Sequence, residues 1–309
     1  MMKKIPIWKN VILIVSTIVM ILLATYAWFV TSPWAELNGF DVNVKGSSFI
    51  QISNDGENWA DDLEVEIGLN DHIKEVSGNG VKLYAPVYDY VETADGGMSP
   101  IIAKFVDATG SQKYYEQIVS FRSDGNHDLY LAPGSYVSAV SGDEESYING
   151  AVRVAFFELD ANGKETLKYI WAPNATVEYS PQTGSFTKDG TVEANYYYQT
   201  SSTPVDVSTL PEGVQNPNVA IIPTADSNNP GEILTCGYNG AYKFMWSSAD
   251  ELPADAPSLM TLSLSEGETM VSKRLKIKVW LEGHDRECVS QLAGQSFTMK
   301  FEFSATKGE

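Results

Sequence analysis

Residues that usually carry catalysis or bind metals are scarce in this sequence. The 309-residue chain has two cysteines, Cys236 and Cys288, and three histidines, His72, His127 and His284. The histidines form no HExxH motif, the cysteines form no CxxC pair, and neither a GxSxG motif nor a phosphate-binding glycine loop occurs. The sequence therefore gives no support for a zinc protease, a serine hydrolase or a nucleotide-binding enzyme. We expect a protein that is not an enzyme and that has no metal site and no cofactor.

Positive charge is scarce as well. Lys and Arg number 21 against 40 Asp and Glu, so the formal net charge is −19. Binding to a nucleic-acid backbone needs a basic face, because much of the affinity comes from neutralising phosphates. The acidic balance argues against nucleic acid and against anionic lipid as partners, and it is typical of a well-solvated exported protein.

The few basic residues at the N-terminus are arranged in a recognisable order. Lys3, Lys4 and Lys9 precede an uncharged apolar run at 11–24. This order is typical of an export signal, in which the lysines stay on the cytoplasmic side of the membrane. We therefore expect the remainder of the chain to be extracellular or on the cell surface.

Two fates of this N-terminal segment remain open. Thr25 and Ala27 are small residues at the positions that a signal peptidase reads, so a cut between Ala27 and Trp28 is one prediction. The alternative is an uncut membrane anchor, because residues 11–30 carry no charge and are long enough to cross a bilayer. The signal peptidase is a partner in the first case and the membrane in the second.

Strand patterns dominate the rest of the chain. Residues 297–303 alternate phenylalanine or methionine with polar residues, and 40–44, 63–69 and 275–279 alternate in the same way. Such a period of two predicts strands with one buried and one solvated face. In 274–279 the solvated face would hold Arg274, Lys276 and Lys278.

Turn signals lie between these runs. Asn162-Gly163 separates 151–159 from 165–171, which predicts a β-hairpin. Helical signals are few, and 112–121 fits either a short helix or a strand. We predict an all-β fold, a jelly-roll-like antiparallel β-sandwich with long loop excursions, preceded by an N-terminal hydrophobic helix.

The domain organisation follows from these patterns. Residues 1–27 form the signal peptide or anchor, and 28–46 form an extended segment. Residues 47–309 form the sandwich domain. The stretch 201–232 has five prolines and many Asn and Ser residues, and we interpret it as a long excursion from the sandwich, with a domain linker as the alternative.

Several side chains have two interpretations each. Cys236 and Cys288 form either one disulfide, worth about 4 kcal/mol through loop closure, or two buried thiols. Exposed tryptophans could bind sugars, and the candidates are Trp59, Trp171, Trp246 and Trp280. For Trp171 and Trp280, which lie at strand ends, core or sheet-edge packing is the expected role. The acidic turns 53–58 and 123–128 are either hairpin turns or calcium ligands, although neither matches an EF-hand loop.

Two short motifs at the ends of the chain resemble one known family. The motif "TYAWF" at 25–29 is similar to the cleavage region of the TasA/camelysin family of exported Gram-positive biofilm-matrix proteins, and "FTMKFEFSAT" at 297–306 is similar to the family's last strand. The resemblance implies a jelly-roll subunit that polymerises into fibres. It also implies that a freed N-terminal segment pairs as an extra strand with the neighbouring subunit.

The segment after the predicted cut carries suitable side chains for such a donor strand. An added strand satisfies the unpaired backbone groups of a sheet edge, while alternate side chains fill pockets. The alternative is that the segment forms the first strand of its own domain. The donor-strand candidates are Trp28, Val30, Trp34, Leu37, Phe40, Val42 and Val44.

Three functions are weighed on this basis. The first is an exported, non-enzymatic structural protein that forms an extracellular fibre or biofilm matrix by strand addition, with further copies of itself as partners. The second is a surface binding module, for example for glycans, tethered to the membrane through residues 11–30. The third is a secreted hydrolase, for which the sequence offers no motif.

Overall fold

The computed structural model describes residues 34–45, 50–66, 72–78, 80–92, 94, 96–132, 134–139, 148–172, 177–180, 185–188, 196–200, 219–223, 233–239, 258–283, 288 and 292–305. Within these residues, no helix is both long enough and apolar enough to cross a membrane. The predicted signal or anchor, and the hydrophobic helix expected there, lie outside the described residues.

The described part of the chain is almost entirely β-strand. It contains nineteen strands, of which seventeen connect through backbone pairing into one large sheet and two form a separate hairpin. One short helix is described, α2 (Ile148–Ala151). The all-β prediction is therefore confirmed.

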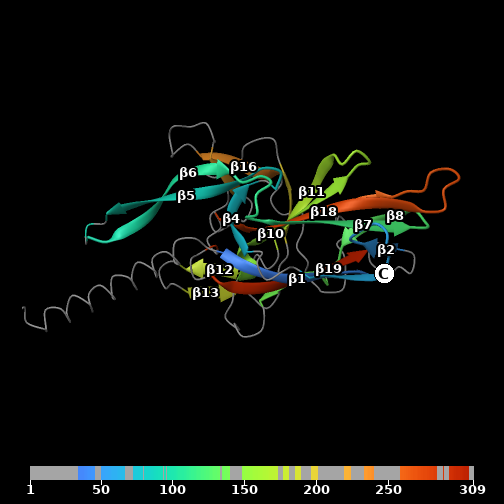
Figure 1. Cartoon of the computed structure of the whole chain (residues 1–309), viewed down its shortest axis with the longest axis horizontal. Helices are drawn as coiled ribbons and strands as arrows, with labels where there is room; N and C mark the ends of the chain where they lie inside the picture. Colours follow the sequence, from blue (N-terminus) through green and yellow to red (C-terminus); the bar gives the residue numbers. More distant parts are fainter. Residues whose placement is uncertain are drawn as a thin grey trace, which may run out of the picture.

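Two groups of strands make up most of this sheet (Figure 1). The first strand group runs in the order β3 (Asp62–Glu66), β1 (Trp34–Lys45), β19 (Gln295–Ser304) and β9 (Tyr136–Ala139). The second strand group runs in the order β2 (Ile50–Ser53), β7 (Tyr115–Ser123), β18 (Val271–Glu282), β10 (Val152–Leu159), β11 (Glu165–Ala172) and β14 (Tyr196–Thr200).

The remaining strands connect or extend these groups. One of them, β4 (His72–Gly78), joins the two groups. Its residues 72–74 pair with the start of β1, and its residues 75–76 pair with the end of β18. The others are β5 (Leu83–Glu92) with β6 (Met98–Asp107), β8 (His127–Leu131) with β17 (Met260–Leu262), β15 (Val219–Pro223) with β16 (Ile233–Asn239), and the separate hairpin of β12 (Val177–Ser180) and β13 (Ser185–Lys188).

The two strand groups face each other across one aromatic core. Phe301 of β19 lies at its centre, with ring centroids 5.4 Å from Phe40 of β1, 5.8 Å from Phe156 of β10 and 6.0 Å from Trp171 of β11. All these contacts are edge-to-face, the arrangement that aromatic rings favour. The core therefore holds together strands from both ends of the sequence.

Several strand predictions are confirmed. Phe297, Met299, Phe301 and Phe303 are all buried in β19. The hairpin of β10 and β11 forms around Gly163, whose φ of 80° lies in the left-handed region that glycine favours. The ambiguous stretch 112–121 contributes to β7, a strand.

Pairing is mixed rather than wholly antiparallel. Most pairs are antiparallel as expected, but β1 pairs in parallel with β19, and the end of β18 pairs in parallel with β4. A local alternation of apolar and polar residues gives the face of a strand and not its direction, so the sequence pattern could not distinguish the two.

The solvated face expected for β18 is wrong at one position. Lys278 is buried, with 3% of its surface exposed, because residues 80–85 and 108–114 cover this outer face of the second strand group. They form a second apolar cluster with Phe157 and Trp280, among others. The Lys278 ammonium lies 4.6 Å from the centre of the Phe157 ring, and it donates to the Gly80 carbonyl at 3.4 Å.

Carboxylates of β7 and β11 neutralise the lysines of β18. Lys276 contacts Glu165 of β11 at 2.6 Å and Glu116 of β7 at 3.0 Å, and Lys278 lies 3.3 Å from Glu116. Glu158 of β10 bridges two more lysines, Lys168 and Lys273. Partial burial alone would raise the pKa of Glu165, but its bonds to the lysines outweigh burial and hold that pKa below its usual range.

Removing the central ring should destabilise the fold strongly. Phe301→Ala leaves a cavity among three aromatic side chains, and we expect a loss of about 3–5 kcal/mol in the free energy of unfolding. Thr298→Ala, on the half-exposed face of the same strand, should cost less than about 1 kcal/mol. Chemical denaturation with fluorescence detection measures both, and a similar loss for the two variants would contradict the assigned core.

The ion pairs of β18 should stabilise the fold over a defined pH range. The folded-state pKa of Glu165 is lowered, so its contribution is complete above the unfolded value of about 4.3 and disappears as the pH falls through the folded value. The pKa of Lys276 is raised: burial opposes the shift, but bonds to Glu165 and Glu116 outweigh it. Its contribution is therefore complete below about pH 10.4 and disappears as the pH rises through the folded value.

The Glu165→Gln variant isolates this effect. The difference in unfolding free energy between wild type and variant should be largest between about pH 5 and pH 10 and should shrink on both sides of that range. Urea unfolding at a series of pH values measures it. A difference that stays constant down to pH 3 would show that the carboxylate is not preferentially ionised in the folded state.

Candidate assembly site

The donor-strand candidates that the structure describes lie in β1, within the chain's own sheet. Leu37, Phe40 and Val42 are buried in the core, Val44 packs against it, and Trp34 is half-buried at the start of the strand. Trp28 and Val30 lie outside the described residues, as do Thr25 and Ala27 of the predicted cut. The donor role towards a neighbouring subunit stays a prediction.

The backbone of β1 changes phase in the middle of the strand. Ala35 and Leu37, at odd positions, and Phe40 and Val42, at even positions, all point into the core. A regular strand cannot do this because its side chains alternate strictly. The pairing with β19 shifts register between Leu37 and Phe40, and Gly39 there has a φ of 144°, which favours glycine.

Pairing on both sides fixes β1 in place. Parallel pairing with β19 covers most of its length, with Val42 opposite Phe301. On the other edge β3 pairs with residues 39–43 and β4 with 34–36, both antiparallel. These contacts satisfy the strand's backbone within one chain, and an identical strand from another copy could make the same contacts.

The start of β1 is held by side-chain contacts. The Gly294 amide donates to the Trp34 carbonyl at 3.0 Å, and the Trp34 ring packs edge-on against His72 with centroids 4.7 Å apart. Glu36 accepts a hydrogen bond from Ser296 Oγ at 3.3 Å, and its carboxylate lies 3.6 Å from His72 Nδ1. These contacts fix the start of β1 beside β4.

A second feature of the same end of the molecule is a projecting two-stranded ribbon, which we call the arm. It consists of β5, β6 and the turn between them, and Figure 1 shows it extending away from the body. Among the described residues, five of the eight large apolar side chains with high exposure lie in or next to the arm. These are Val81, Tyr90, Val91, Met98 and Val106.

The root of the arm is anchored by buried carboxylates. Tyr88 donates to Glu75 of β4 at 2.6 Å, and Glu75 has 4% of its surface exposed. Burial, and then the Glu75 carboxylate, hold the pKa of Tyr88 well above its usual range, so the phenol keeps the proton that it donates. Nearby, Glu282 accepts hydrogen bonds from Ser77 Oγ and from Trp280 Nε1.

The remaining candidate residues have structural surroundings where they are described. Trp171 and Trp280 are fully buried, which confirms core packing over an exposed sugar-binding surface. Cys288 is buried, but the side chain of Cys236 in β16 lies outside what the structure describes, so the disulfide stays a prediction.

The acidic turn 53–58 is a self-contained turn. Asp55 Oδ1 accepts the Glu57 and Asn58 amides, each at 2.8 Å, and a hydrogen bond from Ser53 Oγ at the same distance. Bonds to the Asn58 and then the Glu57 amide hold the pKa of Asp55 well below its usual range. Within the described residues, no group of three or more His, Cys, Asp or Glu side chains is arranged to hold a metal ion.

The arm was not identified from the sequence. Its apolar residues occupy both even and odd positions of 83–91, so no one-sided pattern distinguished exposed from buried positions. The available signal was the Asp95-Gly96 turn between two apolar runs, which is typical of a hairpin. Comparison with known proteins adds no further guide, since no family model, no curated protein and no solved structure matches this chain.

The Tyr88 anchor can be tested with a matched pair of variants. Tyr88→Phe removes one donor from the buried Glu75 carboxylate and should cost about 1–3 kcal/mol. Tyr90→Phe removes the same hydroxyl from an exposed position and should cost less than about 0.5 kcal/mol. Thermal unfolding compares the two, and limited proteolysis within 83–107 tests whether Tyr88→Phe loosens the arm. Equal stability would show that the anchor does not hold the arm.

Proposed function

We propose that this chain is an exported, non-enzymatic structural protein, a subunit of an extracellular fibre of the kind that TasA/camelysin proteins form. In this proposal the subunit is a jelly-roll-like sandwich. Its N-terminus is freed by a cut between Ala27 and Trp28, and copies assemble by strand addition at the surface of a Gram-positive cell.

One observation carries this proposal. β1 lies near the start of the chain, sits between β19 and the pair β3 and β4, and fills the core with Leu37, Phe40 and Val42. Only residues 46–49 connect it to β2. A strand with these contacts can fill the same place in a neighbouring copy, because every pairing would be repeated there.

The energetics favour exchange at high concentration. An exchanged strand makes the same core contacts as a retained one, so the two states differ mainly in chain entropy and in any strain of the 46–49 connection. The retained strand has the advantage of an effective concentration in the millimolar range. Dense secretion, or contacts beyond β1 itself, would shift the balance towards the polymer.

Deleting 28–44 would be a poor test, because it removes four buried core residues of the subunit itself. A covalent reporter of pairing keeps the core intact. Asp41 of β1 and Glu64 of β3 are register partners, and both are exposed. Because cross-strand partners lie within disulfide range, the variant Asp41→Cys/Glu64→Cys should form a bond between whichever two strands are paired.

Strand exchange predicts a ladder of covalent oligomers for this variant. Protein that begins at Trp28 is concentrated, oxidised and run on a non-reducing denaturing gel, with the single variant Asp41→Cys as control for unrelated thiol coupling. Polymers that yield only monomers with an internal disulfide would show that β1 remains paired within its own chain. Absence of polymers from the cut protein would contradict the fibre itself, and recovery of the uncut chain in membranes would favour a tethered binding module.

A further inference from the structure

The arm has the properties of an incomplete sheet. A two-stranded ribbon is marginally stable in water unless a third element covers it. The arm is buried at its root, but every described residue from Asp89 to Met98 is exposed. Tyr90 and Met98, with 43% and 63% of their surfaces exposed, are the residue types that protein interfaces favour.

The faces of the arm are better suited to a partner than its edges. Pro86 in β5 and Pro100 in β6 lack an N–H group, and a strand tolerates proline only where that group would point away from its paired neighbour. Each outer edge therefore lacks a donor, which disfavours a further strand there. On one face the register places Tyr88 opposite position 102, Tyr90 opposite position 100 and Glu92 opposite Met98.

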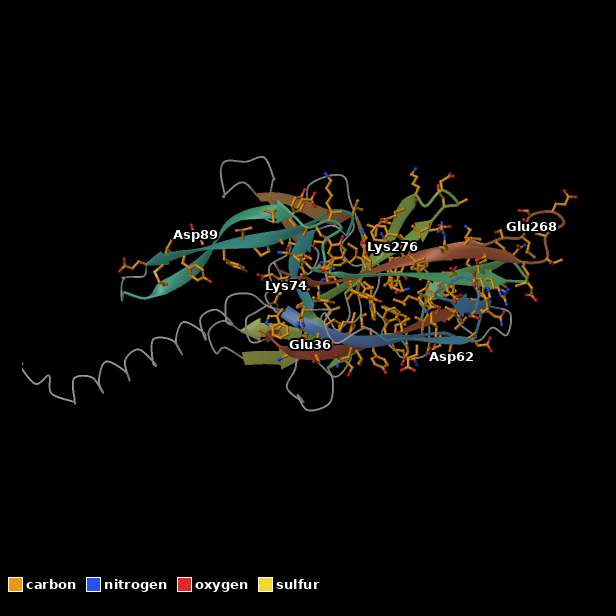
Figure 2. The ribbon with its side chains drawn as sticks, viewed as in Figure 1. Glu36, Asp62, Lys74, Asp89, Glu268 and Lys276 are labelled. Atoms are coloured by element: carbon orange, nitrogen blue, oxygen red, sulfur yellow. The ribbon has the colours of Figure 1, made fainter. Side chains whose placement is uncertain are left out.

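The arm is also acidic. Residues 83–107 contain four acidic residues and one lysine. Two of them, Asp89 and Glu92, are exposed next to the apolar side chains, and Figure 2 shows Asp89 far out on the arm. A second arm or an anionic membrane would be repelled by this charge. A suitable occupant is apolar, carries no negative charge and preferably brings a positive one.

One segment of the chain has this chemistry and starts at the right place. Residues 28–33, "WFVTSP", are apolar at one end and uncharged. A cut after Ala27 gives Trp28 a free α-amino group, which is positively charged below about pH 7.7–8.0.

The position of β1 brings this segment to the arm. Trp34 pairs with Lys74 of β4, and three residues further along β4, Ser77 pairs with Tyr84 of the arm. Figure 2 shows Glu36 and Lys74 towards the end of the body from which the arm leaves, with Asp62 and Glu268 towards the other. An extended six-residue segment spans roughly 20 Å, and Tyr88, two residues before Tyr90, contacts Glu75, the neighbour of Lys74 in β4.

We propose that the arm is the docking surface for residues 28–33. The segment belongs to the copy of β1 that lies between β19 and the pair β3 and β4, whether that copy comes from the same chain or from a neighbouring one. Trp28, Phe29 and Val30 cover the face that carries Tyr90 and Met98, and the freed amino group lies near Glu92 on the same face. The proposal rests on the predicted cut and deepens the proposed function, but it does not require polymerisation, since the segment can come from the same chain or from a neighbour.

Photo-cross-linking tests the contact directly. Protein that begins at Trp28 carries benzoyl-phenylalanine in place of Val30, and it is mixed with an isotopically heavy copy before illumination. Mass spectrometry then assigns each cross-link to residues and to light–light or light–heavy pairs. We expect cross-links to fall mainly within 88–102.

Two changes should reduce the yield. Tyr90→Ser/Met98→Ser removes apolar surface from exposed positions, and Glu92→Gln removes the charge on the same face; we expect about tenfold and severalfold losses, respectively. Ile118→Ser, at an exposed apolar position of β7, is the matched control and should leave the yield unchanged. Circular dichroism confirms that each variant is folded.

The outcomes separate this proposal from the fibre. If the segment cross-links only to the arm of its own chain, the result would support docking on the arm and contradict strand exchange. Light–heavy links to the arm in polymers would support both. Cross-links that fall elsewhere, or a yield that the arm variants do not change, would overturn the dock whether or not polymers form.

Discussion

The packing of Phe301 against rings from both strand groups is the contact on which the rest of the structure depends. Phe40, Phe156 and Trp171 reach it from three different strands, and each meets it edge-on. Because interiors are close-packed, a missing ring there is not replaced by its neighbours. The positions of β1 and β19 are therefore set together, and β1 is as much a part of the core as any later strand.

The outer face of the second strand group is stabilised by different interactions. A lysine on β18 is buried there under residues 80–85, and it is tolerated because Glu116, Glu165 and the Phe157 ring surround it. The same covering segment leads into the arm, so the charge network and the arm's root depend on one stretch of chain. The second strand group thus has an inner side packed with aromatic residues and an outer side on which ion pairs border a smaller apolar cluster.

Local patterns allowed much of the fold to be predicted from the sequence. The alternation in β19 and the Asn162-Gly163 turn follow from side-chain and turn geometry within about ten residues. The burial of Lys278 could not be predicted, because the residues that cover it lie about 200 positions away. The phase change in β1 was visible in hindsight, since Leu37 is out of step with Phe40 and Val42 and a glycine stands between them. The arm's exposure depends on what does not pack against it, which no local pattern records.

The parallel pairing of β1 with β19 also sets the order in which strands can pair during folding. Val42 and Phe301 are register partners although 259 positions separate them in the sequence. Synthesis proceeds from the N-terminus, so β1 can pair early with β3 and β4 but must wait for β19, and such distant closures are slow. During that interval the edge of β1 that later pairs with β19 has no partner strand. If the chain assembles by strand addition as proposed, the time needed to close the sheet would decide whether a chain completes itself or its neighbour.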